Sequence, residues 1–261
     1  MGIEVFRKHL REKRAIKINA GIDNYNLDNV ARICRASQKA KASAVGVACS
    51  KDVFTTARKN TKLPIFVSSI HPFELLKAVQ WGADAIEIGD FSALYKQGNK
   101  FSMEDAYNIV LETLSLINKY DVFVCATIPG CIKIEEQIEL AKRFEILGID
   151  LVQTEGIKEV TVLDSDTYRF ANSLDVATIH TRELYKNSTL PIMTISSPDV
   201  HNTTLIFSAG ANAVNLDFNL NNSTTEVEMC AAIMSVVSSV SYKNSINREL
   251  RFARKEMARL Q

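Results

Sequence analysis

The chain has 261 residues, of which 46% are hydrophobic, and this suits one large domain or two small ones with a sizeable core. Its 31 basic and 30 acidic side chains leave a formal net charge of +1, so no bulk field would draw it to nucleic acid or to an anionic membrane. No apolar run approaches the roughly 18 to 20 residues that a membrane span needs, and we expect partners to be recognised locally.

The cysteines and histidines also limit the chemistry. The five cysteines are an odd number without a C-x-x-C pair, namely Cys34, Cys49, Cys125, Cys131 and Cys230. Because no signal peptide is recognisable, we expect reduced thiols in a cytosol-like compartment rather than disulfides. The four histidines show no ligand spacing, so the sequence predicts no metal site and no cofactor.

Short β-rich runs alternate with helical runs along the whole chain. A basic N-terminal helix is expected over residues 1–14 and leads into the first strand. Eight β-rich runs follow, at residues 15–21, 42–49, 63–69, 83–90, 121–129, 150–156, 190–197 and 212–218. Since parallel neighbours need a crossover that a helix supplies, this strict alternation predicts a parallel sheet.

The helical runs between these strands have recognisable starts and ends. Residues 134–147 carry apolar side chains at helical spacing. Ser102 to Asp105 is typical of a capping box, and Asp199 or Ser197 can cap the helix after the seventh strand. A glycine ends the helices before strands four, six and eight, at Gly82, Gly148 and Gly210.

Eight β-α units predict a closed (β/α)8 TIM barrel of the aldolase-like type, forming one domain over residues 1–261. A doubly wound open sheet is the alternative, but it would need a glycine-rich first turn, and "NAGIDNYN" contains a single glycine. Residues 243–261 predict an extra C-terminal helix that is long and charged. We interpret it as a solvated cap, with a homodimer-forming helix as the alternative.

In a barrel, strand residues alternate between the helix layer and the interior, and polar residues near the carboxyl ends form the site. Apolar residues expected to face the helices are Ile16, Ile18, Val45, Val47, Ile86, Ile88, Val122, Val124, Val214 and Leu216. The complementary set faces inward and includes Lys17, Asn19, Gly46, Ser68, Glu87, Cys125, Thr127, Gln153, Glu155, Asn215 and Asp217.

The inward set predicts acid-base chemistry. Glu87 lies in the middle of an apolar strand, where an unpaired carboxylate would be costly, and it shares the interior with Lys17. With Glu155 and Asp217, carboxylates outnumber the lysine, so at least one carboxyl pKa should be raised toward neutral pH. Glu87 and Glu155 are therefore the candidate acid or base, and Lys17 balances charge or stabilises a developing enolate.

Other interpretations of these residues remain open. Lys17 with Glu87 or Asp217 could be a purely structural pair, and an imine-forming Lys17 is disfavoured because nearby carboxylates would hold its proton. Cys125 is expected to be buried and to serve packing. His71 is expected to be a turn residue at the rim of the barrel. Polar residues expected to contact substrate are Asn19, Ser68, Thr127, Gln153, Ser196 and Asp217.

A phosphate-binding cup is not favoured. Barrels that bind phosphate often have glycines after strands seven and eight, whereas the turns here read "TISSPDV" and "VNLDFNLNNS" and lack glycine. Asp199 and Asp217 would also repel an anion.

The segment "LPIFVSSIHPFELLKAVQWGADAIEIGDFSALYKQGNKFS" and the later "LVQTEG" resemble a family of plastids and cyanobacteria, hypothetical chloroplast reading frame number twenty-three, of the Ycf type. The resemblance extends from "RAIKINAGIDNYN" to about Gly156. It implies a TIM barrel in the chloroplast stroma or a cyanobacterial cytoplasm, and it implies no reaction. Family members look more glycine-rich after strands seven and eight, where this chain has Ser197-Pro198 and Asn215 to Asp217, and Gly130 stands where a polar residue is expected.

Two functions follow from these observations. The first is an enzyme that binds or transforms a small polar metabolite by acid-base chemistry at the carboxyl ends of the strands. The second is a non-catalytic barrel, either a metabolite sensor or an interaction scaffold that uses its rim and its C-terminal helix.

Overall fold

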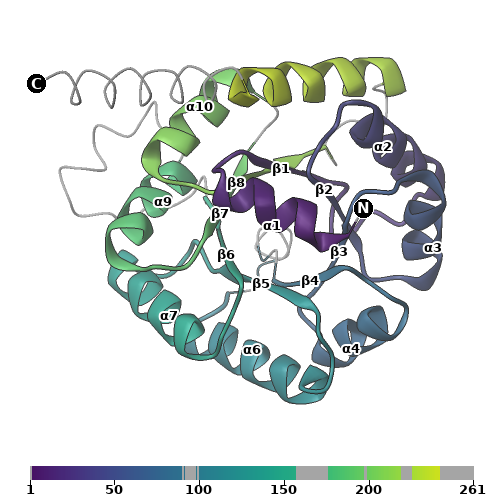
Figure 1. Cartoon of the computed structure of the whole chain (residues 1–261). Helices are drawn as coiled ribbons and strands as arrows, with labels where there is room; N and C mark the ends of the chain where they lie inside the picture. Colours follow the sequence, from purple (N-terminus) through teal and green to yellow (C-terminus); the bar gives the residue numbers. More distant parts are fainter. Residues whose placement is uncertain are drawn as a thin grey trace, which may run out of the picture.

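The computed structural model describes residues 2–89, 91, 98, 100–156, 176–196, 199–218 and 225–241. Eight parallel strands form a closed barrel in sequential order, with β1 pairing to both β2 and β8 (Figure 1). The strands are β1 (Ala15–Asn19), β2 (Ala44–Ala48), β3 (Ile65–Ser69), β4 (Ala85–Ile88), β5 (Phe123–Ile128), β6 (Leu151–Thr154), β7 (Ile192–Ser196) and β8 (Ala213–Asp217). Each strand lies within its predicted run, and the predicted barrel is confirmed.

Apart from the first helix, which lies across one end of the barrel, the helices surround the barrel in one layer (Figure 1). They are α1 (Ile3–Arg11), α2 (Leu27–Lys39), α3 (Lys51–Asn60), α4 (Pro72–Gln80), α6 (Met103–Ile117), α7 (Ile134–Ile146), α9 (Val176–Asn187) and α10 (Val200–Ala209). Residues 226–241 are also helical and follow β8. The predicted C-terminal helix over 243–261 lies outside the described residues.

Local signals read from the sequence set the ends of these helices. Ser102 Oγ accepts a hydrogen bond from the Asp105 amide at 3.1 Å, and the Asp105 side chain accepts one from the Ser102 amide at 2.9 Å. Asp199 caps α10 by accepting from the Asn202 amide at 2.8 Å. Gly210 ends α10 with φ +124°, a conformation that L side chains rarely adopt, and a Cβ there would meet the Tyr185 ring at 2.3 Å.

The helix-facing sides of the strands form the main core. Nine of the ten residues predicted to face the helices are buried in one hydrophobic cluster with helix side chains, and Val122 is partly buried against the same cluster. Inward and outward residues therefore alternate as expected for a barrel.

Helix α1 closes the amino-terminal end of the barrel and lies across it in Figure 1. Its Phe6 is fully buried, with ring centroids 4.9 Å from Phe66 and 5.7 Å from Phe123. Arg7 Nη1 donates to Asp150 at 2.8 Å, which ties the helix to the start of β6. Because this end is filled by aromatic rings, the polar interior lies toward the carboxyl ends of the strands.

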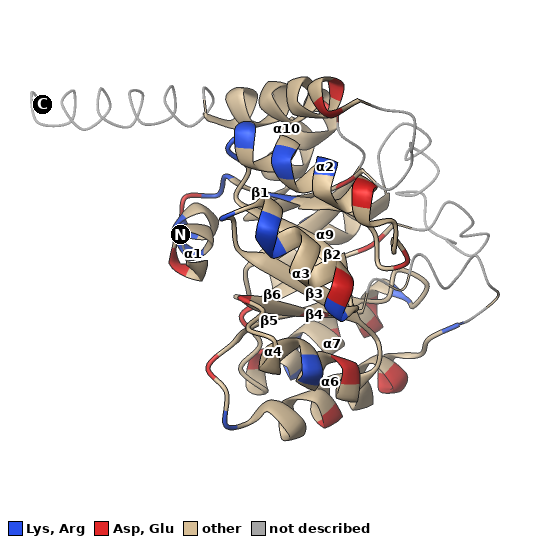
Figure 2. Cartoon of the chain, turned by 90° about the vertical axis from the view of Figure 1, so that its right-hand side faces the viewer, with Lys and Arg blue, Asp and Glu red and all other residues tan. Residues whose placement is uncertain are grey.

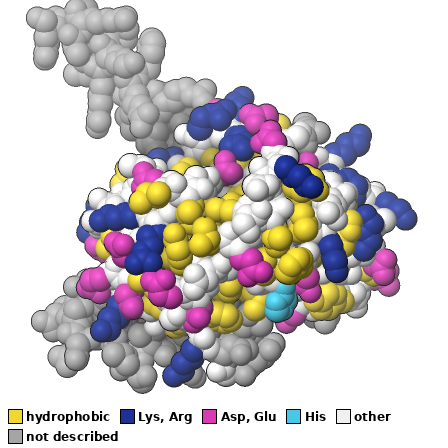
Figure 3. All heavy atoms as spheres, turned by 90° about the horizontal axis from the view of Figure 1, so that it is seen from below, with side chains coloured by type: hydrophobic (Ala, Val, Ile, Leu, Met, Phe, Trp, Pro, Cys, Tyr) yellow, Lys and Arg dark blue, Asp and Glu magenta, His cyan; other side chains and the backbone are white. Residues whose placement is uncertain are grey.

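The outer surface carries both signs of charge, as the small net charge predicts. Figure 2 shows Lys and Arg alongside Asp and Glu on the surrounding helices. On the face in Figure 3, hydrophobic side chains occur in patches between charged ones, as on most protein surfaces. Among the described helices, none is long and apolar enough to cross a membrane.

Candidate functional site

A lysine and a glutamate meet inside the barrel. Lys17 of β1 and Glu87 of β4 form an ion pair between Lys17 Nζ and Glu87 Oε2, and their side chains are 0% and 1% exposed. Strands β1 and β4 are separated in the barrel by β2 and β3. The contact therefore crosses the interior, so both side chains point inward as the sequence predicts.

Gly46 makes this crossing possible. The Lys17 side chain passes over β2 at Gly46, where a Cβ atom would lie 2.6 Å from Lys17 Cε and 3.1 Å from Nζ. Any side chain at position 46 would therefore compete with the lysine for the same space. Lys17 Nζ also lies 5.3 Å from the centroid of the Phe66 ring, a separation at which a cation and a ring attract.

Glu87 uses its two carboxylate oxygens differently. Oε2 accepts from Lys17 and also from Ser68 Oγ at 2.7 Å. Oε1 is buried and has no hydrogen-bond partner. Since buried polar atoms in native proteins are nearly always paired, an orphaned carboxylate oxygen calls for an explanation, such as a bound water, an ion or a functional role.

A second set of polar side chains crosses the interior from β8 to β5. Asn215 Nδ2 donates to Gln153 Oε1 at 2.7 Å, and Gln153 Nε2 donates to Thr127 Oγ1 at 3.2 Å. The Asn215 contact passes over β7, so these amides also point into the barrel. Asn215 Oδ1 is the second buried acceptor here that lacks a partner.

Glu155 stands at the end of β6 and is fully buried. Strand alternation places it on the same side as Leu151 and Gln153, which face the interior. Gly130 presses against its backbone, since a Cβ at position 130 would lie 2.8 Å from the Glu155 carbonyl oxygen. The tight fit explains why glycine occupies the place in "TIPGC" where a polar residue is expected.

His180 of α9 holds the same backbone from the helix layer. Its Nδ1 lies 2.9 Å from the Glu155 carbonyl oxygen, and because a carbonyl only accepts, Nδ1 carries the proton. Its Nε2 then accepts from Gln137 Nε2 of α7 at 3.4 Å, a long hydrogen bond. Burial lowers the pKa of His180, and the hydrogen bond to the Glu155 backbone, the smaller of the two effects, acts in the opposite direction.

Cys125 is packing in the interior rather than a nucleophile. It is the Cα partner of Glu87 and belongs to the buried cluster at the α1 end of the barrel. Burial raises the pKa of its thiol well above the usual value, and the Glu87 carboxylate adds to this effect. A thiol that stays protonated is a poor nucleophile, in agreement with the sequence interpretation.

The remaining predicted residues are placed as follows. Asn19 is buried beside Gly46, and its Oδ1 accepts from the Gly21 amide at 3.3 Å. Asp217 is half-buried at the end of β8 and is the Cα partner of Asn19. Ser196 is the Cα partner of Leu216, which packs in the helix-facing core, so alternation turns Ser196 toward the helices. The expectation that Ser196 contacts substrate in the interior is therefore wrong.

Three further residues form or support the site, namely Asn215, His180 and Gln137. The sequence already places Asn215 on the inward side of β8 together with Asp217, although it is not among the residues expected there to contact substrate. Nothing in the sequence indicates His180 or Gln137, since both lie on helices. His180 bonds to the Glu155 carbonyl oxygen, and Gln137 bonds to His180 and to the Ile132 carbonyl oxygen. Within the described ranges, no group of three His, Cys, Asp or Glu side chains could hold a metal ion.

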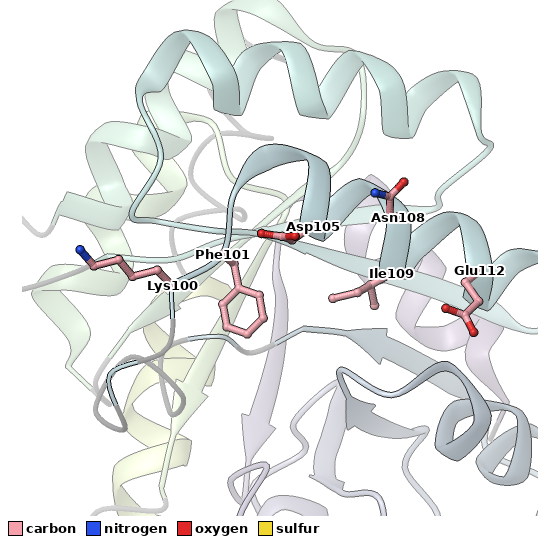
Figure 4. A pocket seen from close by; sticks show the side chains of 6 residues that line it. All are labelled: Lys100, Phe101, Asp105, Asn108, Ile109 and Glu112. Atoms are coloured by element: carbon pink, nitrogen blue, oxygen red, sulfur yellow. The ribbon is translucent and has the colours of Figure 1, made fainter.

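A surface groove lies apart from this interior. It runs along α6, has a volume of about 410 Å³, and is lined by Lys100, Phe101, Asp105, Asn108, Ile109 and Glu112 (Figure 4). None of these residues is on a strand, so the groove is not part of the polar interior of the barrel.

Comparison with known proteins gives the family of the chain. Residues 4–246 match the family described as "Protein of unknown function (DUF561)". "Uncharacterized protein ycf23" of Cyanophora paradoxa is 31% identical over 235 residues, covering 89% of this chain and 95% of that protein. The ycf23 protein of Porphyra purpurea is 28% identical, covering 92% of this chain and 89% of that protein.

Solved structures show the same fold at low identity. A truncated 3-deoxy-D-arabino-heptulosonate 7-phosphate synthase from Thermotoga maritima has a TM-score of 0.60 at 14% identity, covering 90% of this chain and 87% of that chain. A (S)-3-O-geranylgeranylglyceryl phosphate synthase from Thermoplasma acidophilum has a TM-score of 0.58 at 14% identity, covering 92% of this chain and 98% of that chain. These likenesses show the barrel alone, whereas the sequence relatives show that the chain belongs to the DUF561 family of ycf23 proteins.

Proposed function

We propose that the protein binds and transforms a small polar metabolite by acid-base chemistry at the carboxyl ends of the strands. The observation that carries this proposal is the orphaned Glu87 Oε1, which lies in the barrel interior on a carboxylate held by Lys17 and Ser68. A carboxylate fixed at one oxygen and unpartnered at the other is oriented to exchange a proton with a bound group.

Glu155 is the second acid or base in this proposal. Its backbone is clamped between Gly130 and the His180 imidazole, so its position at the end of β6 is well defined. Such support reduces the freedom of a reacting group, which favours a precise geometry. Lys17 would stabilise negative charge that develops on the substrate. Asn19, Ser68, Thr127, Gln153 and Asp217 would orient the substrate.

The comparisons support the broad class of this function. The two structural neighbours reported above are metabolite-processing enzymes, and both of their names include a phosphorylated compound. The relatives named ycf23 are consistent with a plastid location, and we propose the chloroplast stroma or the cytoplasm of a cyanobacterium. We propose a small-molecule ligand as the partner, with no role for nucleic acid, membrane or cofactor, and leave homodimer formation as a proposal.

A non-catalytic metabolite sensor or interaction barrel is the second candidate. The observation that favours it is that most of the interior polar groups already bond to one another: Lys17 pairs with Glu87, and the Asn215, Gln153 and Thr127 side chains form a chain of hydrogen bonds. Such networks also occur where polar groups serve the fold alone.

Native mass spectrometry of protein purified from its own host tests the proposed function. We expect a retained small molecule that wild-type protein converts and the Glu155→Gln variant holds unchanged. A retained molecule that neither protein converts would support the sensor. Protein that retains nothing, together with a Glu155→Gln variant that behaves as wild type against a metabolite panel, would contradict both ligand-based functions.

A further inference from the structure

The interior atoms that lack partners share one property. Four buried side-chain atoms of the described residues have no hydrogen-bond partner, and two of them, Glu87 Oε1 and Asn215 Oδ1, lie in the barrel interior. Both are acceptors, and both belong to side chains that are at most 1% exposed. A ligand group that satisfies them must therefore bring hydrogen-bond donors.

The charges of the interior disfavour an anion at this place. Lys17 is the only basic side chain among the described inward-facing strand residues, and Glu87 already pairs with it. Glu155 and Asp217 add further acidic groups toward the carboxyl ends of the strands. Among the strand residues that the structure describes, a phosphate or carboxylate would lose its hydration without meeting a cation that is not already paired, which is costly.

The same geometry disfavours a second cation and favours a hydroxyl. An ammonium ligand at Glu87 would lie close to the Lys17 ammonium on the same carboxylate and be repelled by it. A hydroxyl can donate to Glu87 Oε1 and also accept from Lys17, because an ammonium carries three donors. Asn215 is the Cα partner of Lys17 on β8, so its free oxygen offers a second acceptor on the adjoining strand.

We propose that the part of the ligand that enters the barrel interior is a neutral, hydroxylated group of the sugar or polyol class. One hydroxyl bonds Glu87 Oε1 and Lys17 Nζ, and another bonds Asn215 Oδ1. This inference rests on the proposed function, because it assumes that the interior is a ligand site, and it adds the chemical class of the bound group.

Ligand-detected NMR with the four D-aldopentoses, each measured separately, tests this inference. Stereoisomers share composition and bulk solvent effects, so a difference among them reports contacts in a defined site rather than general stabilisation by sugars. We expect saturable binding that differs at least about tenfold among the isomers, the size of effect that one misplaced hydrogen bond produces in a buried site. Inorganic phosphate should not compete.

The Asn215→Leu variant removes the Asn215 Oδ1 acceptor and should weaken the binding of the preferred isomer by about tenfold or more. Asn108→Leu makes the same chemical change on the exposed surface of α6 and should bind as wild type. Circular dichroism checks that both variants are folded. If Asn215→Leu does not fold, the comparison of the four pentoses with wild-type protein still tests the inference.

Equal or undetectable binding of all four pentoses would overturn the inference, as would displacement by phosphate. A failure of this inference can be told apart from a failure of the proposed function. If the molecule retained from the host is an anion without hydroxyl groups and the protein converts it, the proposed function stands and the hydroxylated class is wrong.

Discussion

Gly46 determines whether Lys17 can reach Glu87, so it is the most sensitive single position near the site. In Gly46→Ala the new Cβ would lie 2.6 Å from Lys17 Cε, and the lysine would have to move away from its carboxylate. We expect a loss of about 1 to 3 kcal/mol in the free energy of unfolding, the usual cost of overpacking, measured by urea denaturation. Gly2→Ala, at an exposed position with open space around it, is the control; it changes only the N-cap of α1 and should cost less than Gly46→Ala.

The contributions of the Lys17 and Glu87 charges to the free energy of unfolding should depend strongly on each other. Removing either partner leaves the other buried and unpaired, so Lys17→Met and Glu87→Leu should each cost about 3 to 5 kcal/mol of stability. The double variant Lys17→Met with Glu87→Leu should recover much of that loss, because no charge is then left uncompensated. Additive losses in this double-mutant cycle would show that the two groups do not interact as the structure has them.

His180 should make stability depend on pH. Burial lowers its pKa in the folded protein, so below the ordinary histidine pKa of about 6.5 the unfolded chain binds a proton that the folded protein does not. The free energy of unfolding should therefore fall as pH drops below about 6.5, until the lowered pKa of the folded state is reached. Denaturation measured between pH 7.5 and 5 should show a shallower dependence in His180→Gln.

His9 needs separate treatment in this experiment because burial also lowers its pKa, and Arg14 adds to the effect. Some pH dependence should remain in His180→Gln for this reason. His201, exposed on α10, gives the matched control, and His201→Gln should keep the wild-type dependence. A pH dependence unaffected by His180→Gln would contradict the neutral, buried imidazole.

At the scale of elements, α1 acts as a plug for the barrel. Its Phe6 ring packs edge-on against Phe66 and Phe123 inside the amino-terminal end. Phe6→Ala should cost about 3 to 5 kcal/mol, as expected for a phenylalanine removed from a core. Phe73 of α4 is 61% exposed, so Phe73→Ala should cost little when both are compared by thermal denaturation. Equal losses would show that α1 does not seal the barrel as the structure has it.

The elements themselves could be read from the sequence because their signals are local. Strand runs of apolar residues, the Ser102 capping box and the turn glycines each act within a few residues of chain, and all of these predictions are confirmed. Alternation along a strand is also local, which is why the inward position of Glu87 was accessible before the structure was known.

The site was less predictable because its contacts cross the barrel. Sequence alternation indicates that Lys17 and Glu87 face inward, but it does not say that the lysine passes over Gly46 to reach β4. Ser196 shows a second limit. In "LPIMTISS" both alternating sets mix apolar and polar residues, and packing selects Met193 rather than Ile192 for the interior, which turns Ser196 toward the helices.

At the scale of the whole molecule, the barrel interior holds buried polar side chains above one closed end. Aromatic rings from α1, β3 and β5 fill the amino-terminal end, and the buried polar groups begin above them with Lys17, Ser68 and Glu87. A ligand would therefore reach these groups from the carboxyl ends of the strands, the end at which TIM-barrel enzymes carry their active sites.

A crystal structure of protein purified from its own host tests the central claim most directly. The account predicts density for an organic molecule in hydrogen-bonding contact with Glu87 Oε1, with hydroxyl groups toward Glu87 and Asn215. Ordered water alone at Glu87 Oε1 and Asn215 Oδ1, in a barrel that holds no organic molecule, would contradict it.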